Sequence, residues 1–192
     1  MADSPYAGLL QDKWGEKTSE LIAQHPLKKQ EIAEVVLQAW KDIFDSRLGP
    51  KGFQIGKDIF PQPQIMAFLL HELVPLELAT RYPQKWRRDV SGTDKDVVYI
   101  PDDRFSVEIK TSSSANGIFG NRSYAQTTQG DKKSKSGYYL AVNFGGFDEQ
   151  NTECRASGSF VLVGWTIVTG WARKQRRANR RTPLPRRENT NC

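Results

Sequence analysis

The sequence has few of the residues that form metal clusters or disulfide frameworks. Of its 192 residues, two are cysteine (Cys154 and Cys192) and two are histidine (His25 and His71). Two cysteines supply neither a disulfide framework nor a zinc cluster. Two histidines argue against a metal site built on imidazole ligands. Disulfide-stapled and zinc-binding proteins are therefore poor matches for this composition.

The sequence also lacks long hydrophobic runs. No apolar stretch approaches the roughly 18 residues that a transmembrane helix needs, and the N-terminus has no basic region followed by an apolar stretch, as a secretory signal would. Hydrophobic residues still make up 38% of the chain, with 9 Phe, 6 Tyr and 5 Trp, which is enough for a sizeable core. We expect a soluble cytoplasmic protein with no membrane partner and no small-molecule cofactor.

The formal net charge of +6 comes from one end of the chain. Residues 173–192 hold eight of the 28 basic residues and one of the 22 acidic ones, which leaves 20 basic and 21 acidic residues, a net charge of −1, in residues 1–172. Arginine runs and a proline pair of this kind cannot form a packed element. We therefore predict a single domain over residues 1–172 and a disordered basic tail.

Three segments in the first half of the chain have helical patterns. Residues 30–49 carry apolar side chains at helical spacing and end at a glycine, which is a stop signal. Residues 61–83 begin with prolines suited to a first turn, and Pro75 is expected to break or kink this helix. Residues 17–24 predict a further short helix. Residues 1–91 are thus expected to be the helical part of the domain.

From residue 92 onward the pattern changes to that of β-strands. Val, Ile, Phe and Tyr become frequent in short runs bounded by Gly, Asp, Ser and Asn. These runs are residues 96–100, 104–111, 137–144 and 157–168. Helices followed by two adjacent strands, a connection and two more strands predict an α+β (mixed α/β) domain. Its central mixed sheet is expected over residues 92–172, flanked by helices.

The strand predicted over residues 104–111 carries a glutamate and a lysine on one face. Successive side chains in a strand point to opposite sides, so Glu108 and Lys110 share a face while apolar side chains point to the core. If residues 101–103 close a hairpin as a three-residue loop, Asp96 lies opposite Glu108, with Cβ atoms roughly 4.5–5.5 Å apart. Two carboxylates at such a short distance repel each other unless a cation lies between them. Oxygen ligands of this kind suit Mg²⁺.

An ordinary surface hairpin with an exposed ion pair is the alternative. An acidic residue two positions before a lysine is expected about once by chance in a chain of this size, and a second example, Asp131-Lys132-Lys133, occurs in a predicted loop. The hairpin is more specific, because it adds an acidic residue opposite the glutamate and places the lysine in an apolar strand. We therefore favour a catalytic site.

With this arrangement, the sequence resembles the PD-(D/E)xK nuclease superfamily, the fold of most type II restriction endonucleases. The segments "EIKTSS" and "FGNRSYAQ" are similar to the ScaI-type restriction endonuclease group. The resemblance implies a restriction-endonuclease-like fold in which Asp96, Glu108 and the Ile109 carbonyl bind Mg²⁺. Lys110 would then orient the attacking water or neutralise developing negative charge. The implied activity is sequence-specific cleavage of double-stranded DNA by a homodimer, within a restriction-modification system.

Weaker signals extend this candidate site. Additional acidic ligands are expected among Asp94, Glu72 and Glu77, although a solvated helix face is the favoured explanation of the two glutamates. Gln126 resembles a polar position near the metal in related nucleases, with a plain surface residue as the alternative. Four basic residues are expected either to contact phosphate groups or to form a solvated loop: Arg122, Lys132, Lys133 and Lys135. The segment Trp86-Arg87-Arg88 contacts the DNA backbone or contributes its tryptophan to the core.

The sequence is compatible with three functions. The favoured one is a restriction endonuclease, and the second is a DNA repair or junction nuclease of the same fold. The third is a non-enzymatic DNA-binding protein whose affinity comes from residues 173–192. Those residues add non-specific DNA affinity, or they are a non-native reading frame or the truncated end of a longer protein.

Overall fold

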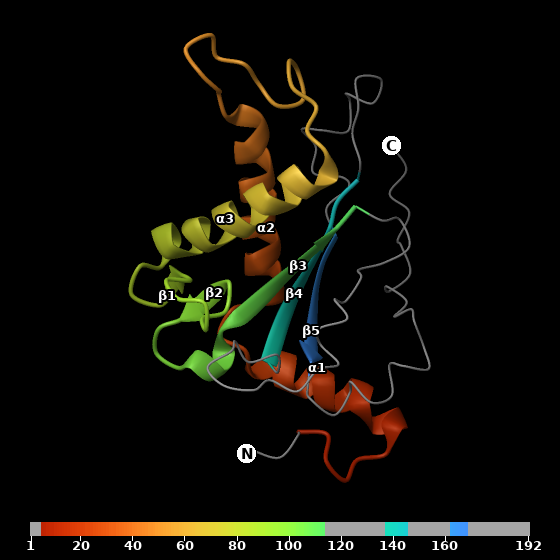
Figure 1. The fold of residues 1–192 in the computed structure, drawn as a ribbon. Helices are drawn as coiled ribbons and strands as arrows, with labels where there is room; N and C mark the ends of the chain where they lie inside the picture. The colour runs from red at the N-terminus through yellow and green to blue at the C-terminus, as the bar shows by residue number, and fades with distance from the viewer. Residues whose placement is uncertain (1–4, 114–136, 146–161, 169–192) are drawn as a thin grey trace.

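The N-terminal part of the chain is helical, as predicted. The computed structural model describes residues 5–113, 137–145 and 162–168. A 3-10 turn, η1 (Gln11–Lys13), leads into the helices α1 (Trp14–Gln24), α2 (Lys29–Asp45) and α3 (Pro63–Arg81) (Figure 1). The predicted apolar face of α2 is the buried one: Ile32, Val35, Val36, Ala39, Trp40, Ile43 and Phe44. Within the described residues, no helix is both long and apolar enough to cross a membrane.

Pro75 was expected to break or kink the helix α3, and a break does not occur there. The helix α3 runs from Pro63 to Arg81 with Pro75 in its interior. A proline there has no N–H to donate to the carbonyl four residues before it, which costs about 3 kcal/mol. The ring of Pro75 is buried beside Val74 and Leu78, so contacts with the core offset this cost and the helix continues.

Five strands form one mixed sheet in the order β1-β2-β3-β4-β5. They are β1 (Trp86–Arg88), β2 (Val97–Tyr99), β3 (Val107–Ser112), β4 (Gly137–Asn143) and β5 (Leu162–Val168). The central strands β3 and β4 are parallel, whereas the other neighbours are antiparallel. This mixed sheet with its helical N-terminal part confirms the α+β class. Only β1 was not predicted, because its sequence Trp-Arg-Arg has two adjacent charged residues and no β-branched side chain.

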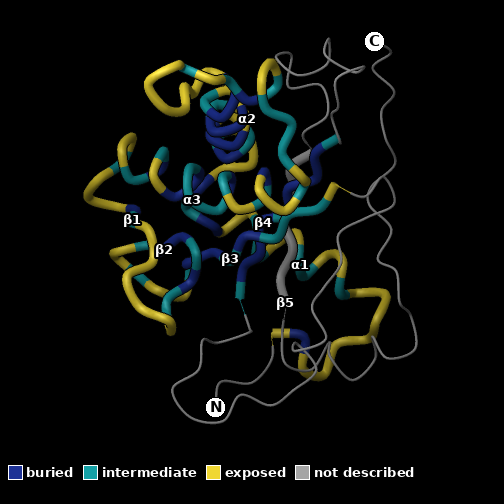
Figure 2. Tube along the Cα trace, turned by 45° about the horizontal axis from the view of Figure 1, so that its top comes forward, coloured by how far each residue is buried: buried dark blue, intermediate teal, exposed yellow. Residues whose placement is uncertain are grey.

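One face of the sheet builds the hydrophobic core with the helices. Ile109 of β3 and Leu140 of β4 are fully buried, and they join α2 and α3 in one cluster (Figure 2). The rings of Trp40 on α2 and Phe144 after β4 lie with centroids 5.3 Å apart. The helix α1 crosses the lower end of the sheet in Figure 1, where the Tyr138 hydroxyl donates to its Leu21 carbonyl at 3.0 Å. Packing on this face leaves the opposite side chains of β3 for other roles.

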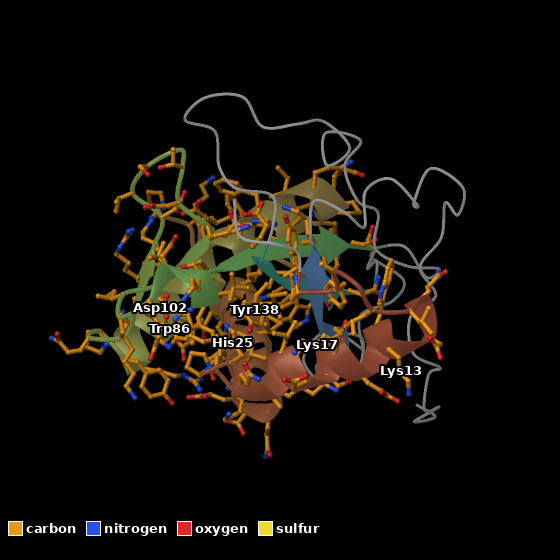
Figure 3. The ribbon with its side chains drawn as sticks, turned by 90° about the horizontal axis from the view of Figure 1, so that it is seen from below. Lys13, Lys17, His25, Trp86, Asp102 and Tyr138 are labelled. Atoms are coloured by element: carbon orange, nitrogen blue, oxygen red, sulfur yellow. The ribbon has the colours of Figure 1, made fainter. Side chains whose placement is uncertain are left out.

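His25 is a structural histidine in this core. Its ring stacks against Trp86 and lies 4.5 Å, centroid to centroid, from Tyr138 (Figure 3). The Leu27 N–H donates to Nδ1 at 3.1 Å, and Nε2 lies 2.9 Å from the Phe105 carbonyl. These partners fit a neutral ring whose Nε2–H donates to Phe105. Burial lowers the pKa of His25 below its ordinary value of 6.5.

Candidate active site

The strand β3 presents a glutamate and a lysine on the face opposite the core. Val107 and Ile109 are buried, while Glu108 and Lys110 alternate with them and are partly exposed. Lys110 Nζ donates to Glu108 Oε1 at 2.8 Å. The two side chains keep only 13% (Glu108) and 26% (Lys110) of their surface exposed. This charged pair therefore lies in a sheltered place, unlike a typical surface ion pair.

Asp96 is held against the same strand by the main chain. Its Oδ2 accepts a hydrogen bond of 2.7 Å from the N–H of Ile109. Because the N–H and C=O of one strand residue point to the same edge, the Ile109 carbonyl also points toward Asp96. The strand β2 begins one residue later, at Val97. A carboxylate, a carbonyl and the Glu108–Lys110 pair are thus brought to one edge of β3.

The predicted pairing of the two strands is present, but the predicted three-residue loop is wrong. Val97 pairs with Val107, and continuing this register outward sets Asp96 opposite Glu108, as expected. The connection contains a 3-10 turn, η2 (Asp103–Phe105), after Tyr99. Two side-chain bonds stabilise it. Ser106 Oγ accepts the Tyr99 N–H at 3.0 Å and donates to Asp103 Oδ1 at 2.7 Å, so a serine replaces a main-chain partner in the ladder.

Two further residues near the site were not predicted. His71 on α3 brings its Nδ1 to 3.6 Å from Asp96 Oδ2. Lys95 is a buried lysine whose Nζ lies 5.1 Å from the centroid of the Tyr139 ring. Tyr139 is the neighbour of Glu108 in the β3–β4 register, so this ammonium lies on the glutamate face of the sheet. A buried lysine is rare without compensation, and an aromatic face supplies part of it.

The donor atoms at this edge suit a magnesium ion better than a transition metal. In the described part of the chain, no three His, Cys, Asp or Glu side chains form a group that could hold a metal. The donors are the Asp96 and Glu108 carboxylates and the Ile109 carbonyl. Magnesium is commonly bound through one or two carboxylates, with water and substrate phosphates completing its shell. This sparse all-oxygen set fits Mg²⁺ and does not fit a four-ligand zinc site.

Comparison with known proteins identifies the family. Residues 4–191 match the sequence profile of the family described as ScaI restriction endonuclease. The chain belongs to the ScaI restriction endonuclease family. It is 42% identical, over 185 residues, to the type II restriction enzyme ScaI of Streptomyces caespitosus, and the alignment covers 96% of this chain and 80% of that enzyme. No solved structure is significantly similar to it.

Membership of the ScaI family confirms the resemblance to the ScaI-type group that the segments "EIKTSS" and "FGNRSYAQ" carry. The relative is a type II restriction enzyme, a class of site-specific deoxyribonucleases. An enzyme of this class is therefore the right assignment for the chain, and a purely DNA-binding protein is not. The site residues within it stay a prediction, which the geometry above supports.

The structure places the additional acidic candidates in ion pairs. Arg87 Nη1 donates to Asp94 Oδ2 at 2.8 Å, and the Val90 N–H donates to the same oxygen. These bonds, chiefly the one from Arg87, lower the pKa of Asp94 to about 2. On α3, Glu72 pairs with Arg88 at 3.0 Å and Glu77 with Arg81 at 2.7 Å. All three carboxylates thus have local structural partners.

The other polar candidates lie outside the described residues. They are Gln126 and the basic residues Arg122, Lys132, Lys133 and Lys135, all between the described ranges that end at 113 and begin at 137. Residues 173–192 also lie outside, although the match to the ScaI family includes all but the last of them. Their roles stay predictions.

Proposed function

We propose that this protein is a magnesium-dependent type II restriction endonuclease that makes double-strand breaks in DNA. The observation that carries the proposal is the 2.7 Å hydrogen bond from the Ile109 N–H to Asp96 Oδ2, because it fixes one carboxylate beside the strand that carries Glu108 and Lys110. Membership of the ScaI family supports the same activity. We also propose a cytoplasmic location, where an enzyme of this class would meet DNA.

Asp96, Glu108 and the Ile109 carbonyl would hold the metal. When bound there, Mg²⁺ acidifies a water molecule and stabilises negative charge on the phosphate. The chain's own contribution is to keep the donors in place. The main-chain bond to Asp96 Oδ2 holds that carboxylate beside β3, and the strand directs Glu108 to the same face. His71, 3.6 Å from Asp96, would orient this carboxylate.

Lys110 is the proposed catalytic cation. Its ammonium already lies 2.8 Å from Glu108, so it can turn from the carboxylate to the attacking water or to a phosphate oxygen. A compact ammonium with three donors suits this task. The water oxygen bonds to phosphorus in line with the P–O3′ bond, which breaks. One proton of the water ends on O3′ and the other passes to solvent, so the products are a 3′-hydroxyl and a 5′-phosphate.

Two such sites would cut both strands in one binding event. We propose that two copies of the chain form a homodimer with two-fold symmetry, so that each copy cuts one strand. A dimer of this kind would match a palindromic target. Analytical ultracentrifugation of the protein with and without DNA tests this part separately. A monomer in both conditions would contradict it.

Digestion of plasmid DNA tests the activity itself. The purified protein is incubated with plasmid in Mg²⁺ and, as the control, in excess EDTA. We expect discrete fragments in Mg²⁺ and intact plasmid in EDTA. A smear would indicate a non-specific nuclease, as would suit the repair alternative, and plasmid left intact in Mg²⁺ would contradict nuclease activity altogether.

A further inference from the structure

Arg88 ends the first strand of the sheet beside the candidate active site. It pairs with Val97 of β2, the residue that follows Asp96. Paired Cα atoms are roughly 4.5–5.5 Å apart, and adjacent ones along the chain are 3.8 Å apart. The Arg88 Cα therefore lies within about 9 Å of the Asp96 Cα. Arg88 is exposed, so a ligand at Asp96 is within reach of its long side chain.

The helix α3 leads to the same place. Arg88 Nη2 lies 3.0 Å from Glu72 Oε2, and Glu72 directly follows His71, which approaches Asp96 to 3.6 Å. The side chains of this pair are 49% (Arg88) and 37% (Glu72) exposed. An ion pair this open contributes little stability. It does hold the guanidinium in one orientation next to the site.

The neighbouring arginine is used differently. Arg87 points to the other side of β1 and donates to Asp94, which also accepts the Val90 N–H. That carboxylate closes the loop between β1 and β2, so Arg87 has a structural role in the fold. Arg88 instead lies on the α3 side of the sheet, the side from which His71 approaches Asp96.

We propose that Arg88 binds a backbone phosphate of the DNA next to the phosphate that is cleaved. The inference rests on the proposed function, because it takes DNA as the ligand of the neighbouring carboxylates. A guanidinium binds phosphate through two parallel hydrogen bonds. Glu72 holds it in the unbound protein and is exchanged for the phosphate when DNA binds. Arg88 and Glu72 then have opposite effects on DNA affinity, since one attracts the backbone and the other repels it.

Binding of DNA by two single variants tests this exchange. Dissociation constants are measured in EDTA, over a range of salt concentrations, with a plasmid-derived duplex that the wild-type protein cleaves in Mg²⁺. We expect Arg88→Ala to raise Kd about tenfold and to lower the salt slope by about one. Glu72→Gln should lower Kd about threefold, because a neutral amide no longer competes with the phosphate.

The pair Asp102–Arg104 provides matched controls. It is an exposed ion pair of 2.7 Å beyond the other end of β2, so Arg104→Ala and Asp102→Asn should leave Kd unchanged. Melting temperatures are recorded for all four variants. A purely structural Arg88–Glu72 pair would lower the melting temperature of both its variants and leave Kd unchanged, which would overturn the inference. Weaker binding in both variants would overturn it as well.

The outcomes separate this inference from the proposed function. Wild-type cleavage together with unchanged binding by Arg88→Ala overturns the inference alone. A wild-type protein that leaves every plasmid intact in Mg²⁺ overturns the proposed function and this inference together. Opposite shifts of Kd for Arg88→Ala and Glu72→Gln, with wild-type cleavage, support both.

Discussion

Two charged pairs in this molecule have the same spacing and nearly the same length, yet different surroundings. Glu108 and Lys110 are two residues apart, with Oε1 and Nζ separated by 2.8 Å. Asp102 and Arg104 are also two residues apart, with Oδ2 and Nη2 separated by 2.7 Å. The Lys110 side chain is 26% exposed, whereas the Arg104 side chain is 85% exposed.

The difference lies in what else each pair can contact. Asp102 accepts the Arg104 N–H and guanidinium, so its charge is used to form the turn at η2. Glu108 and Lys110 extend from a central strand, and Asp96 is bonded to the residue between them. An acidic residue two positions from a cation is therefore common and uninformative by itself. A second carboxylate fixed to the same strand distinguishes the Glu108–Lys110 pair as a candidate catalytic site.

Removing the second carboxylate should have the largest effect. We expect Asp96→Asn to abolish Mg²⁺-dependent cleavage, because the amide can still accept the Ile109 N–H but has no charge to hold a metal. The fold should persist, as circular dichroism would show. Plasmid digestion measures the loss, and Asp102→Asn is the control that should keep wild-type activity. Normal turnover by Asp96→Asn would place the metal site elsewhere.

Replacing the lysine tests whether the sheltered pair is catalytic. Lys110→Ala should lower the single-turnover cleavage rate about 10²–10³-fold while DNA binding survives. Lys110→Arg should rescue little of the rate, because a planar guanidinium cannot take the position of a compact ammonium. Arg104→Lys, in the exposed pair, should change nothing. If Lys110 only pairs with Glu108, its removal would cost about 0–1 kcal/mol of stability and no activity.

A smaller effect is expected at His71, which acts through Asp96. Loss of a residue that orients a metal ligand weakens metal binding about 10–100-fold. His71→Ala should therefore raise the Mg²⁺ concentration needed for half-maximal cleavage, with the rate at saturating Mg²⁺ largely retained. A Mg²⁺ titration of the cleavage rate measures both quantities. An unchanged Mg²⁺ requirement would show that the 3.6 Å approach has no role in metal binding.

The smallest effect should come from Asp94, two residues from Asp96 but paired with Arg87. Its pKa of about 2 lies below the ordinary value of 3.8, so its stabilising contribution is present above pH 3.8 and is lost as the pH falls toward 2. Asp94→Asn should lower the free energy of unfolding by about 1 kcal/mol at neutral pH, because Arg87 is partly exposed. Urea unfolding at pH 7 and pH 3 measures this, and the difference between variant and wild type should shrink at pH 3. Loss of cleavage in this variant would instead make Asp94 part of the site.

The positions that could be predicted from the sequence are those whose contacts are local in the chain or follow the regular period of a strand or helix. The alternation of Val107 and Ile109 with Glu108 and Lys110 predicted both faces of β3. The register that sets Asp96 opposite Glu108 was also predicted, although the connecting loop was not. The serine that replaces a ladder partner there leaves no periodic signal in the sequence.

Contacts between distant elements could not be read in the same way. His71 reaches Asp96, and Arg88 reaches Glu72, only because α3 packs beside β1 and β3. A histidine within an apolar helix gives no sign of which loop it will approach. The one available signal was the pair of arginines after Trp86, which the sequence left open between core and DNA contact. Trp86 is part of the core, and contact with DNA stays a prediction for Arg88.

The most direct test of the central claim compares one substitution in each pair. Glu108→Gln and Asp102→Asn both neutralise a carboxylate next to a cation two residues away, with almost no change in shape. Single-turnover cleavage of plasmid-derived DNA is measured for both variants across a Mg²⁺ titration, with melting temperatures as the control for folding. We predict that Glu108→Gln is folded and inactive at every Mg²⁺ concentration, whereas Asp102→Asn cleaves as the wild type does. Wild-type cleavage by Glu108→Gln would contradict the assignment of the active site to β3.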